Sequence, residues 1–277
     1  MLLVASAALG ALSVVVPPVR GVRAEATAAP VVEVAIAPSD DLPDSEPVRL
    51  RTRDGRTLAG NFYEVPREDD PVPAVVLIHD LGAERTELEP IVERLVKSKF
   101  AVLSFDLRGH GESADEDCNW SKMDEEERAR LVPFTLLDVN AALDWLMEDP
   151  RVRGVRTHVI GSGHGALLAG RIATDERVTS LTVLEPATEG FDMELADLLA
   201  DAEGLSMQIA SSRDDEERWK EWLVAEEIDD LVEVRASKGD AGDLFSDKRF
   251  RISLCRWIDE RREGTASVRG TAGKGRR

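Results

Sequence analysis

Histidine is scarce in this sequence: its 277 residues include only four, and none lies beyond position 164. An imidazole base near the C-terminus is therefore excluded. Cysteine is scarcer still, because Cys118 and Cys255 permit one disulfide at most and lack the CxxC spacing of a metal site. So sparse a pair is no disulfide framework, and we expect two buried thiols. The four histidines are His79, His110, His158 and His164.

Basic residues are too few to balance the acidic ones, since 35 Lys and Arg stand against 54 Asp and Glu, a formal net charge of −19. A body this acidic repels phosphate backbones and anionic membrane surfaces, so nucleic-acid binding is not expected. The only basic patch is the Gly- and Arg-rich tail 261–277, which is typical of a frayed chain end. With 43% hydrophobic and 32% charged residues, the chain fits neither a disordered protein nor a membrane bundle.

The N-terminus carries an apolar run over residues 2–16, followed by two prolines and the small-residue pattern Val22-Arg23-Ala24. This arrangement is typical of a signal peptide, here residues 1–24, and predicts export to the periplasm or beyond the cell. No Lys or Arg precedes the run, and its length falls short of the roughly 20 residues that cross a bilayer comfortably. An uncleaved membrane anchor is the competing interpretation, and a buried core helix is a third.

The rest of the chain divides into an Ala- and Pro-rich linker over 25–46, a folded domain over 47–260 and the tail. In the domain, short apolar or β-branched runs alternate with amphipathic stretches, which predicts an α/β fold with a mostly parallel, doubly wound sheet. A hairpin with an Asp-Gly turn is expected over 48–65. The remaining strands are expected at 74–78, 101–105, 157–160, 181–184, 207–210 and 231–234.

The clearest helix is predicted from about residue 134 to residue 149, where Pro150 stops it. Asp138 and Glu148 lie outside its apolar stripe. The stripe consists of Leu136, Val139, Leu143 and Leu146.

Three motifs follow three successive strands, at the carboxyl ends where ligands bind in such sheets. They are His79-Asp80-Leu81-Gly82, the segment 106–113 (DLRGHGES), and the segment 161–165 (GSGHG). In this order they resemble the α/β-hydrolase superfamily, whose pattern is a His-Gly oxyanion loop, an Asp-x-Arg-Gly-x-Gly-x-Ser segment and a Gly-x-Ser-x-Gly nucleophile elbow. The resemblance covers about residues 48–260 and is strongest to the compact branch of dienelactone hydrolases and serine peptidase or esterase relatives. No lid domain follows Leu184, so only the acidic loop 114–132 is expected to cover the site.

The elbow lacks its serine in the register that sterics favour. The chain reverses so tightly there that the positions two before and two after the nucleophile must be small, and Gly161 and Gly165 fit them. Gly163 then occupies the nucleophile position, where it relieves the strain that a catalytic residue imposes and offers no Oγ for an acyl-enzyme. The alternative register, with Ser162 as nucleophile, places Ile160 and His164 at the crowded positions and is rejected.

The resemblance also implies where the other two members of the triad should lie. Asp214 and Asp215 follow the strand 207–210, so an acid is available. The family's histidine follows the last strand, and Asp240 stands at that position. The triad is therefore predicted to be lost at two separate points.

The four histidines do not replace the missing base. His79 and His110 are expected to shape their loops, His158 to lie in the core, and His164 to point away along the helix start. They sit on different elements without metal-ligand spacing, so neither a metal nor another cofactor is expected. The backbone amides of Leu81 and His164 would still form an oxyanion hole able to hold a small carboxylate or carbonyl ligand.

Three functions remain open. The first is an exported, catalytically inactive α/β-hydrolase-fold protein that binds a ligand or a protein partner. The second is an active hydrolase of esters, lactones or peptides with a non-standard set of residues, for example Ser162 with an unexpected base. The third is an enzyme that uses carboxylates alone, drawn from Asp106, Asp214, Asp215 and Asp240.

Overall fold

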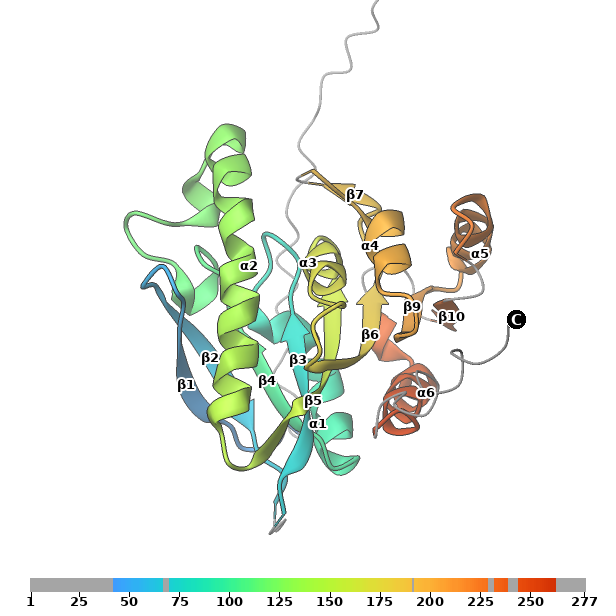
Figure 1. The fold of residues 1–277 in the computed structure, drawn as a ribbon, viewed down its shortest axis with the longest axis horizontal. Helices are drawn as coiled ribbons and strands as arrows, with labels where there is room; N and C mark the ends of the chain where they lie inside the picture. Colours follow the sequence, from blue (N-terminus) through green and yellow to red (C-terminus); the bar gives the residue numbers. More distant parts are fainter. Residues whose placement is uncertain (1–41, 67–69, 191, 229–231, 239–243, 263–277) are drawn as a thin grey trace, which may run out of the picture. The chain divides into compact units, whose positions relative to one another are not determined.

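A computed structural model describes residues 42–66, 70–190, 192–228, 232–238 and 244–262, and its centre is an eight-stranded sheet (Figure 1). The strand order is β1-β2-β4-β3-β5-β6-β9-β10, with an antiparallel start at β1 and β2 and parallel pairing from β4 to β10. This confirms the α/β fold with a mostly parallel sheet. The strands are β1 Glu46–Arg51, β2 Thr57–Tyr63, β3 Val72–Ile78, β4 Ala101–Phe105, β5 Val152–Ser162, β6 Val178–Leu184, β9 Ser206–Ser212 and β10 Val232–Ser237.

Helices cover both faces of the sheet and bury one apolar cluster on each (Figure 1). The first cluster lies under α2 Glu125–Glu148, α3 Gly165–Arg171, α4 Leu195–Asp201 and α5 Glu216–Ala225. The second lies under α1 Glu89–Lys97 and α6 Lys248–Asp259. Every residue of β3 is buried between the two layers, as its uninterrupted apolar sequence predicts. A small ribbon of β7 Glu189–Gly190 and β8 Met193–Glu194 follows β6.

The helix α2 begins at Glu125, well before the start near residue 134 that periodicity predicts. Asp124 caps it: its side chain accepts from the amide of Glu127, whose side chain accepts in return from the amide of Asp124. Pro133 lies inside the helix and removes one backbone donor without ending it. The expected covering loop 114–132 is therefore wrong in its second half, which is helical, and only 114–124 remains outside α2.

Asp138 is fully buried, although it lies outside the apolar stripe of the helix. Its carboxylate accepts hydrogen bonds from the backbone amide, Nε and Nη2 of Arg108, at 2.7–3.1 Å. Arg108 in turn reaches Asp54 in the β1–β2 turn at 2.7 Å. A buried ion pair therefore fixes α2 to the loop after β4, which periodicity in a single element does not reveal.

Both cysteines are buried free thiols, as expected. Cys255 packs in the apolar cluster under α1 and α6, where burial raises the pKa of its thiol to about 12. Cys118 lies beside Gly109 in the loop after β4. Within the described residues, no helix is both long and apolar enough to cross a membrane. The predicted signal segment 1–24, the linker up to residue 41 and the tail from residue 263 fall outside those residues.

Candidate functional site

The turn between β5 and α3 has Gly163 at its tip. Gly161 and Gly165 lie on either side, and a Cβ on Gly161 would overlap the carbonyl of Gly165, while one on Gly165 would overlap the carbonyl of His79. These close approaches are the physical reason why both positions must be small. Gly163 has a φ of +53°, the left-handed conformation that glycine adopts without strain. The structure thus places Gly163 at the tip of the turn, between two positions that have no room for a side chain.

The two amides expected to form an oxyanion hole converge on one atom, Oδ1 of Asp80. The Leu81 amide donates to it at 2.8 Å and the His164 amide at 2.7 Å. The ring of His164 turns back to the same oxygen, with Nδ1 at 3.0 Å, so the expectation that it points away along the helix is wrong. We call Asp80, Leu81, Gly163 and His164 the elbow site. Its anion-binding donors are formed, and a carboxylate of the chain itself occupies them.

Asp80 and Gly163 are complementary. A Cβ built on Gly163 would overlap Cγ and both carboxylate oxygens of Asp80. In the loop motif that this segment resembles, a glycine follows the histidine; here Asp80 follows His79. The aspartate side chain therefore lies in the space that a side chain at position 163 would need, and it can lie there because residue 163 has none.

The electrostatics of the elbow site favour a charged pair. Burial opposes ionisation of Asp80, but the hydrogen bonds from His164 and Leu81 outweigh it and lower the pKa of the carboxyl. The hydrogen bond to Asp80 raises the pKa of His164, with burial acting against it. The side chains remain 38% and 41% exposed, respectively, so solvent reaches both. The ribbon of β7 and β8 borders the ring, since a Cβ on Gly190 would lie 3.3 Å from Cδ2 of His164.

Beside the elbow site, Glu87 joins two segments. One of its carboxylate oxygens accepts the hydroxyl of Ser162 at 2.6 Å and the other accepts the backbone amide of Asp80 at 2.8 Å. Burial raises the pKa of the Glu87 carboxyl, and the negative charge of Asp80 adds to the effect. Ser162 is the last residue of β5, and its hydroxyl is directed to Glu87.

His79 and His110 support the surrounding loops. Nδ1 of His79 donates to the carbonyl of Asp80, and its Nε2 accepts from the amide of Leu107 at 3.0 Å. Nδ1 of His110 donates to the carbonyl of Arg108, and its Nε2 accepts from the amide of Gly82 at 3.0 Å. Both rings are therefore neutral, and burial lowers the pKa of His79 to about 3 and also lowers that of His110.

The remaining part of the expected covering loop packs against His110. Trp120 stacks on His110 with ring centroids 4.9 Å apart, and the guanidinium of Arg128 in α2 also lies over the Trp120 ring. His158 is fully buried in β5, as expected, with Nδ1 2.6 Å from Oγ of Ser180. The three buried histidines, His79, His110 and His158, therefore each contact neighbouring segments of the fold.

Of the carboxylates considered for acid–base chemistry, the three that the structure describes have separate surroundings. Asp106 is buried and accepts from the backbone and guanidinium of Arg85. Asp215 accepts from the hydroxyl of Ser212 and pairs with Arg218, while Asp214 is exposed in the turn after β9. Asp240 lies outside the described residues, so its position stays a prediction.

Three carboxylates that matter here were missed by sequence reasoning: Asp80, Glu87 and Glu185. Glu185 directly follows β6 and has a φ of +39°; its carboxylate accepts the Ser212 amide at 2.5 Å, and burial raises the pKa of its carboxyl. For Asp80 a signal existed, since it stands where the resembled motif has glycine. Nothing local marks Glu87 or Glu185, because their partners come from distant segments.

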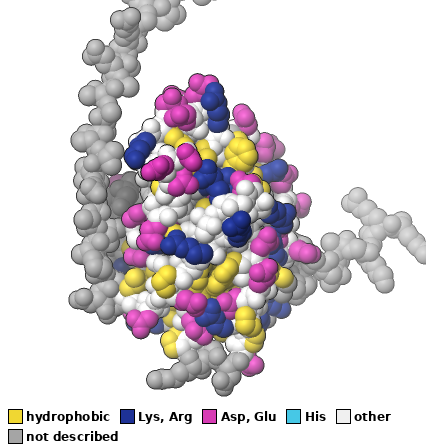
Figure 2. All heavy atoms as spheres, turned by 90° about the vertical axis from the view of Figure 1, so that its left-hand side faces the viewer, with side chains coloured by type: hydrophobic (Ala, Val, Ile, Leu, Met, Phe, Trp, Pro, Cys, Tyr) yellow, Lys and Arg dark blue, Asp and Glu magenta, His cyan; other side chains and the backbone are white. Residues whose placement is uncertain are grey.

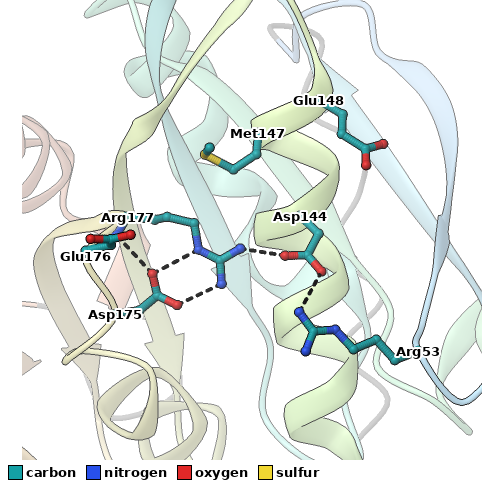
Figure 3. A pocket seen from close by; sticks show the side chains of 7 residues that line it. All are labelled: Arg53, Asp144, Met147, Glu148, Asp175, Glu176 and Arg177. Atoms are coloured by element: carbon teal, nitrogen blue, oxygen red, sulfur yellow. Dashed lines mark hydrogen bonds and ion pairs between the residues drawn. The ribbon is translucent and has the colours of Figure 1, made fainter.

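A groove of about 560 Å³ lies elsewhere, between the C-terminal half of α2 and the loop before β6 (Figure 3). Its arginines are already paired: Arg177 with Asp175 and Asp144, and Arg53 with Asp144 at 3.5 Å (Figure 3). The face around β1 and α2 interleaves acidic, basic and apolar side chains (Figure 2). Within the described part of the chain, no cluster of three His, Cys, Asp or Glu residues could hold a metal ion.

This strand order, with an elbow between β5 and α3, defines an α/β-hydrolase fold. A profile of the alpha/beta hydrolase family matches residues 75–266, and the chain belongs to that family. No curated protein matches the chain.

Solved structures share the fold at low identity. An esterase of Pyrococcus furiosus is 16% identical, with a TM-score of 0.63 over 82% of this chain and 94% of its own. A hypothetical protein of Pseudomonas aeruginosa is 16% identical, with a TM-score of 0.65 over 81% and 96%. A protein assigned to the dienelactone hydrolases, from Klebsiella pneumoniae, is 12% identical, with a TM-score of 0.55 over 81% and 98%.

Proposed function

We propose that this chain is a catalytically inactive member of the alpha/beta hydrolase family that acts by binding. One observation carries the proposal: the carboxylate of Asp80 fills the space in front of Gly163 and takes both oxyanion-hole amides. A serine hydrolase needs a nucleophilic oxygen at that point and free donors beside it. The elbow site offers neither, while the fold around it is intact.

The binding function has two candidate partners, a small carboxylate or carbonyl ligand at the elbow site and another protein. The donors at Leu81 and His164 support the first, because they already hold a carboxylate. Export is part of the proposal and rests on the apolar run over residues 2–16 and the small residues before position 25.

Labelling with a fluorophosphonate, followed by mass spectrometry, tests inactivity directly. We expect the wild-type protein to remain unlabelled and to hydrolyse no p-nitrophenyl ester above the background rate. Covalent capture at any serine would overturn the proposal.

Restoring the lost residues gives a constructive test. The triple variant Asp80→Gly, Gly163→Ser, Asp240→His should react with the fluorophosphonate at residue 163. The matched control keeps Asp80 and changes only the other two positions. We expect the control to stay unreactive, since Asp80 overlaps any side chain at 163. Equal labelling of both variants would show that Asp80 does not obstruct the nucleophile position.

A second candidate function has one contact in its favour, the hydrogen bond of 2.6 Å between the Ser162 hydroxyl and Glu87. A carboxylate with a raised pKa in that position is a conceivable base for a serine. The occupied amides at Leu81 and His164 argue against it, because they leave no donor for an oxyanion. Labelling that is lost in Ser162→Ala and kept in Ser121→Ala would establish this alternative.

A further inference from the structure

We propose that Asp80 is a tethered blocker of the elbow site, which opens to a monocarboxylate ligand only when the Asp80 side chain rotates out. This inference rests on the proposed binding function and assigns its ligand class and its regulation. The structure shows the blocked state, in which one carboxylate oxygen of Asp80 accepts hydrogen bonds from two backbone amides and one imidazole nitrogen.

A rotation of the Asp80 side chain alone would release it from the donors. The backbone of Asp80 is fixed, since its amide donates to Glu87 and its carbonyl accepts from His79 and from the amide of Ala83. Only the short side chain needs to turn, and it lies 38% exposed to solvent. Rotation into water would leave Leu81 and His164 as donors with unchanged positions.

The donors determine what replaces it. Because all three point at one oxygen, they suit a carboxylate oxygen better than a neutral carbonyl, whose hydrogen bonds are weaker. Glu87 accepts a hydrogen bond from the backbone amide of Asp80, and its interaction with the Asp80 charge is repulsive. A second negative charge on the ligand is therefore disfavoured, and the site selects monocarboxylates over dianions such as phosphate.

An intramolecular competitor lowers the apparent affinity of a ligand, because the ligand can bind only during the fraction of time that the site is vacant. If Asp80 occupies the donors about nine-tenths of the time or more, the apparent dissociation constant rises by about tenfold or more. Removing the carboxylate should therefore tighten the binding of a free carboxylate by at least about tenfold, without any new contact.

Acetate is the probe, added as the sodium salt to uniformly 15N-labelled protein at constant ionic strength. The backbone amide signals of Leu81 and His164 report the site itself. We expect saturable shifts of both signals in Asp80→Ala, with a dissociation constant at least about tenfold lower than in wild type. Sodium chloride and phosphate at the same ionic strength should produce no comparable shifts.

Asp115→Ala is the matched control. Asp115 also accepts two backbone amides on one carboxylate oxygen, those of Asp117 and Cys118 at 2.9 and 2.7 Å, but no imidazole joins them. Its removal should not alter acetate binding at Leu81 and His164. If Asp80→Ala fails to fold, Asp80→Asn provides a graded comparison: it removes the charge but keeps an oxygen that accepts more weakly from the same donors, so it should bind acetate more tightly than wild type does.

The outcomes separate this inference from the proposed function. Equal acetate affinity in wild type and both Asp80 variants would overturn the blocker but leave a binding site. Absence of shifts in every variant would overturn the monocarboxylate assignment. Neither result bears on catalytic inactivity, which fluorophosphonate labelling decides independently.

Discussion

Two residues, Asp80 and Gly163, are sterically complementary at the turn between β5 and α3. Each makes the other acceptable, because the aspartate fills the volume that the glycine leaves open. The glycine also carries a φ of +53°, where any other residue adds backbone strain of about 1–3 kcal/mol. Backbone strain and steric overlap with Asp80 therefore contribute separately to the free-energy cost of a side chain at position 163.

Substitution Gly163→Ala should lower the free energy of unfolding by about 3–5 kcal/mol, which is backbone strain plus the loss of charge-assisted hydrogen bonds when Asp80 is displaced. In an Asp80→Ala background the same substitution should cost only about 1–3 kcal/mol, because the overlap is gone. Urea denaturation of the four proteins of this cycle measures both values.

The control for backbone strain is Gly204→Ala. Gly204 has a φ of +85° and open space around the position of a Cβ, so it registers strain without overlap. Its cost should match that of Gly163→Ala in the Asp80→Ala background. An identical cost for Gly163→Ala with and without Asp80 would contradict the proposed overlap.

At the scale of elements, α2 depends on a buried charge. Asp138 and Arg108 are 0% and 2% exposed, and three hydrogen bonds of 2.7–2.9 Å connect the helix to the backbone and guanidinium of the loop after β4. That loop carries Asp106 and His110, which contact the segment after β3. The position of α2 is therefore coupled to the position of the elbow site.

Removing one partner of this pair leaves the other charge buried. Asp138→Ala should lower the free energy of unfolding by about 3–5 kcal/mol, whereas Asp144→Ala, at a position nearer the C-terminal end of α2, should cost about 0–1 kcal/mol. Asp144 is 40% exposed and pairs with arginines at the surface groove. Equal costs for the two variants in urea denaturation would show that burial does not decide the value of the pair.

The whole molecule responds to pH through its buried histidines. Burial lowers the pKa of His79 and of His158 to about 3, against an ordinary value of 6.5. Below pH 6.5 the unfolded chain therefore binds protons that the folded protein rejects, so stability falls as the pH falls toward 3. His164 acts in the opposite sense, since its raised pKa contributes stability that is lost as the pH rises above its folded value.

His158 is the histidine best suited to test the loss of stability at acid pH. Its Nε2 has no hydrogen-bond partner in the described structure, so no acceptor would stabilise a proton there. Relative to wild type, His158→Leu should gain about 1.4 kcal/mol of stability for each pH unit below about 6. Carboxylates titrate alike in both proteins and cancel in the difference. Parallel stability curves between pH 6.5 and 5 would mean that this histidine is protonated without resistance in the folded state.

Much of the architecture could be predicted from the sequence, because its causes are local. Apolar runs such as the one in β3 bury a strand on both faces, and alternation with helices dictates a parallel sheet. Helix boundaries were harder to predict from the sequence. The helix α2 begins early because Asp124 and Glu127 cap it, although no apolar stripe marks its first turns.

The spacing of Gly161, Gly163 and Gly165 could be read from the sequence alone and indicates a tight turn. Only the close approach at Gly161 lies within that turn, because a Cβ on Gly165 would meet the carbonyl of His79. What fills the elbow was decided by tertiary structure. Asp80 and His164 lie 84 residues apart, and Arg108 and Asp138 lie 30 apart. A side chain's charge and size can be read from a sequence, but the donors that it meets exist only after the strands have brought distant loops together.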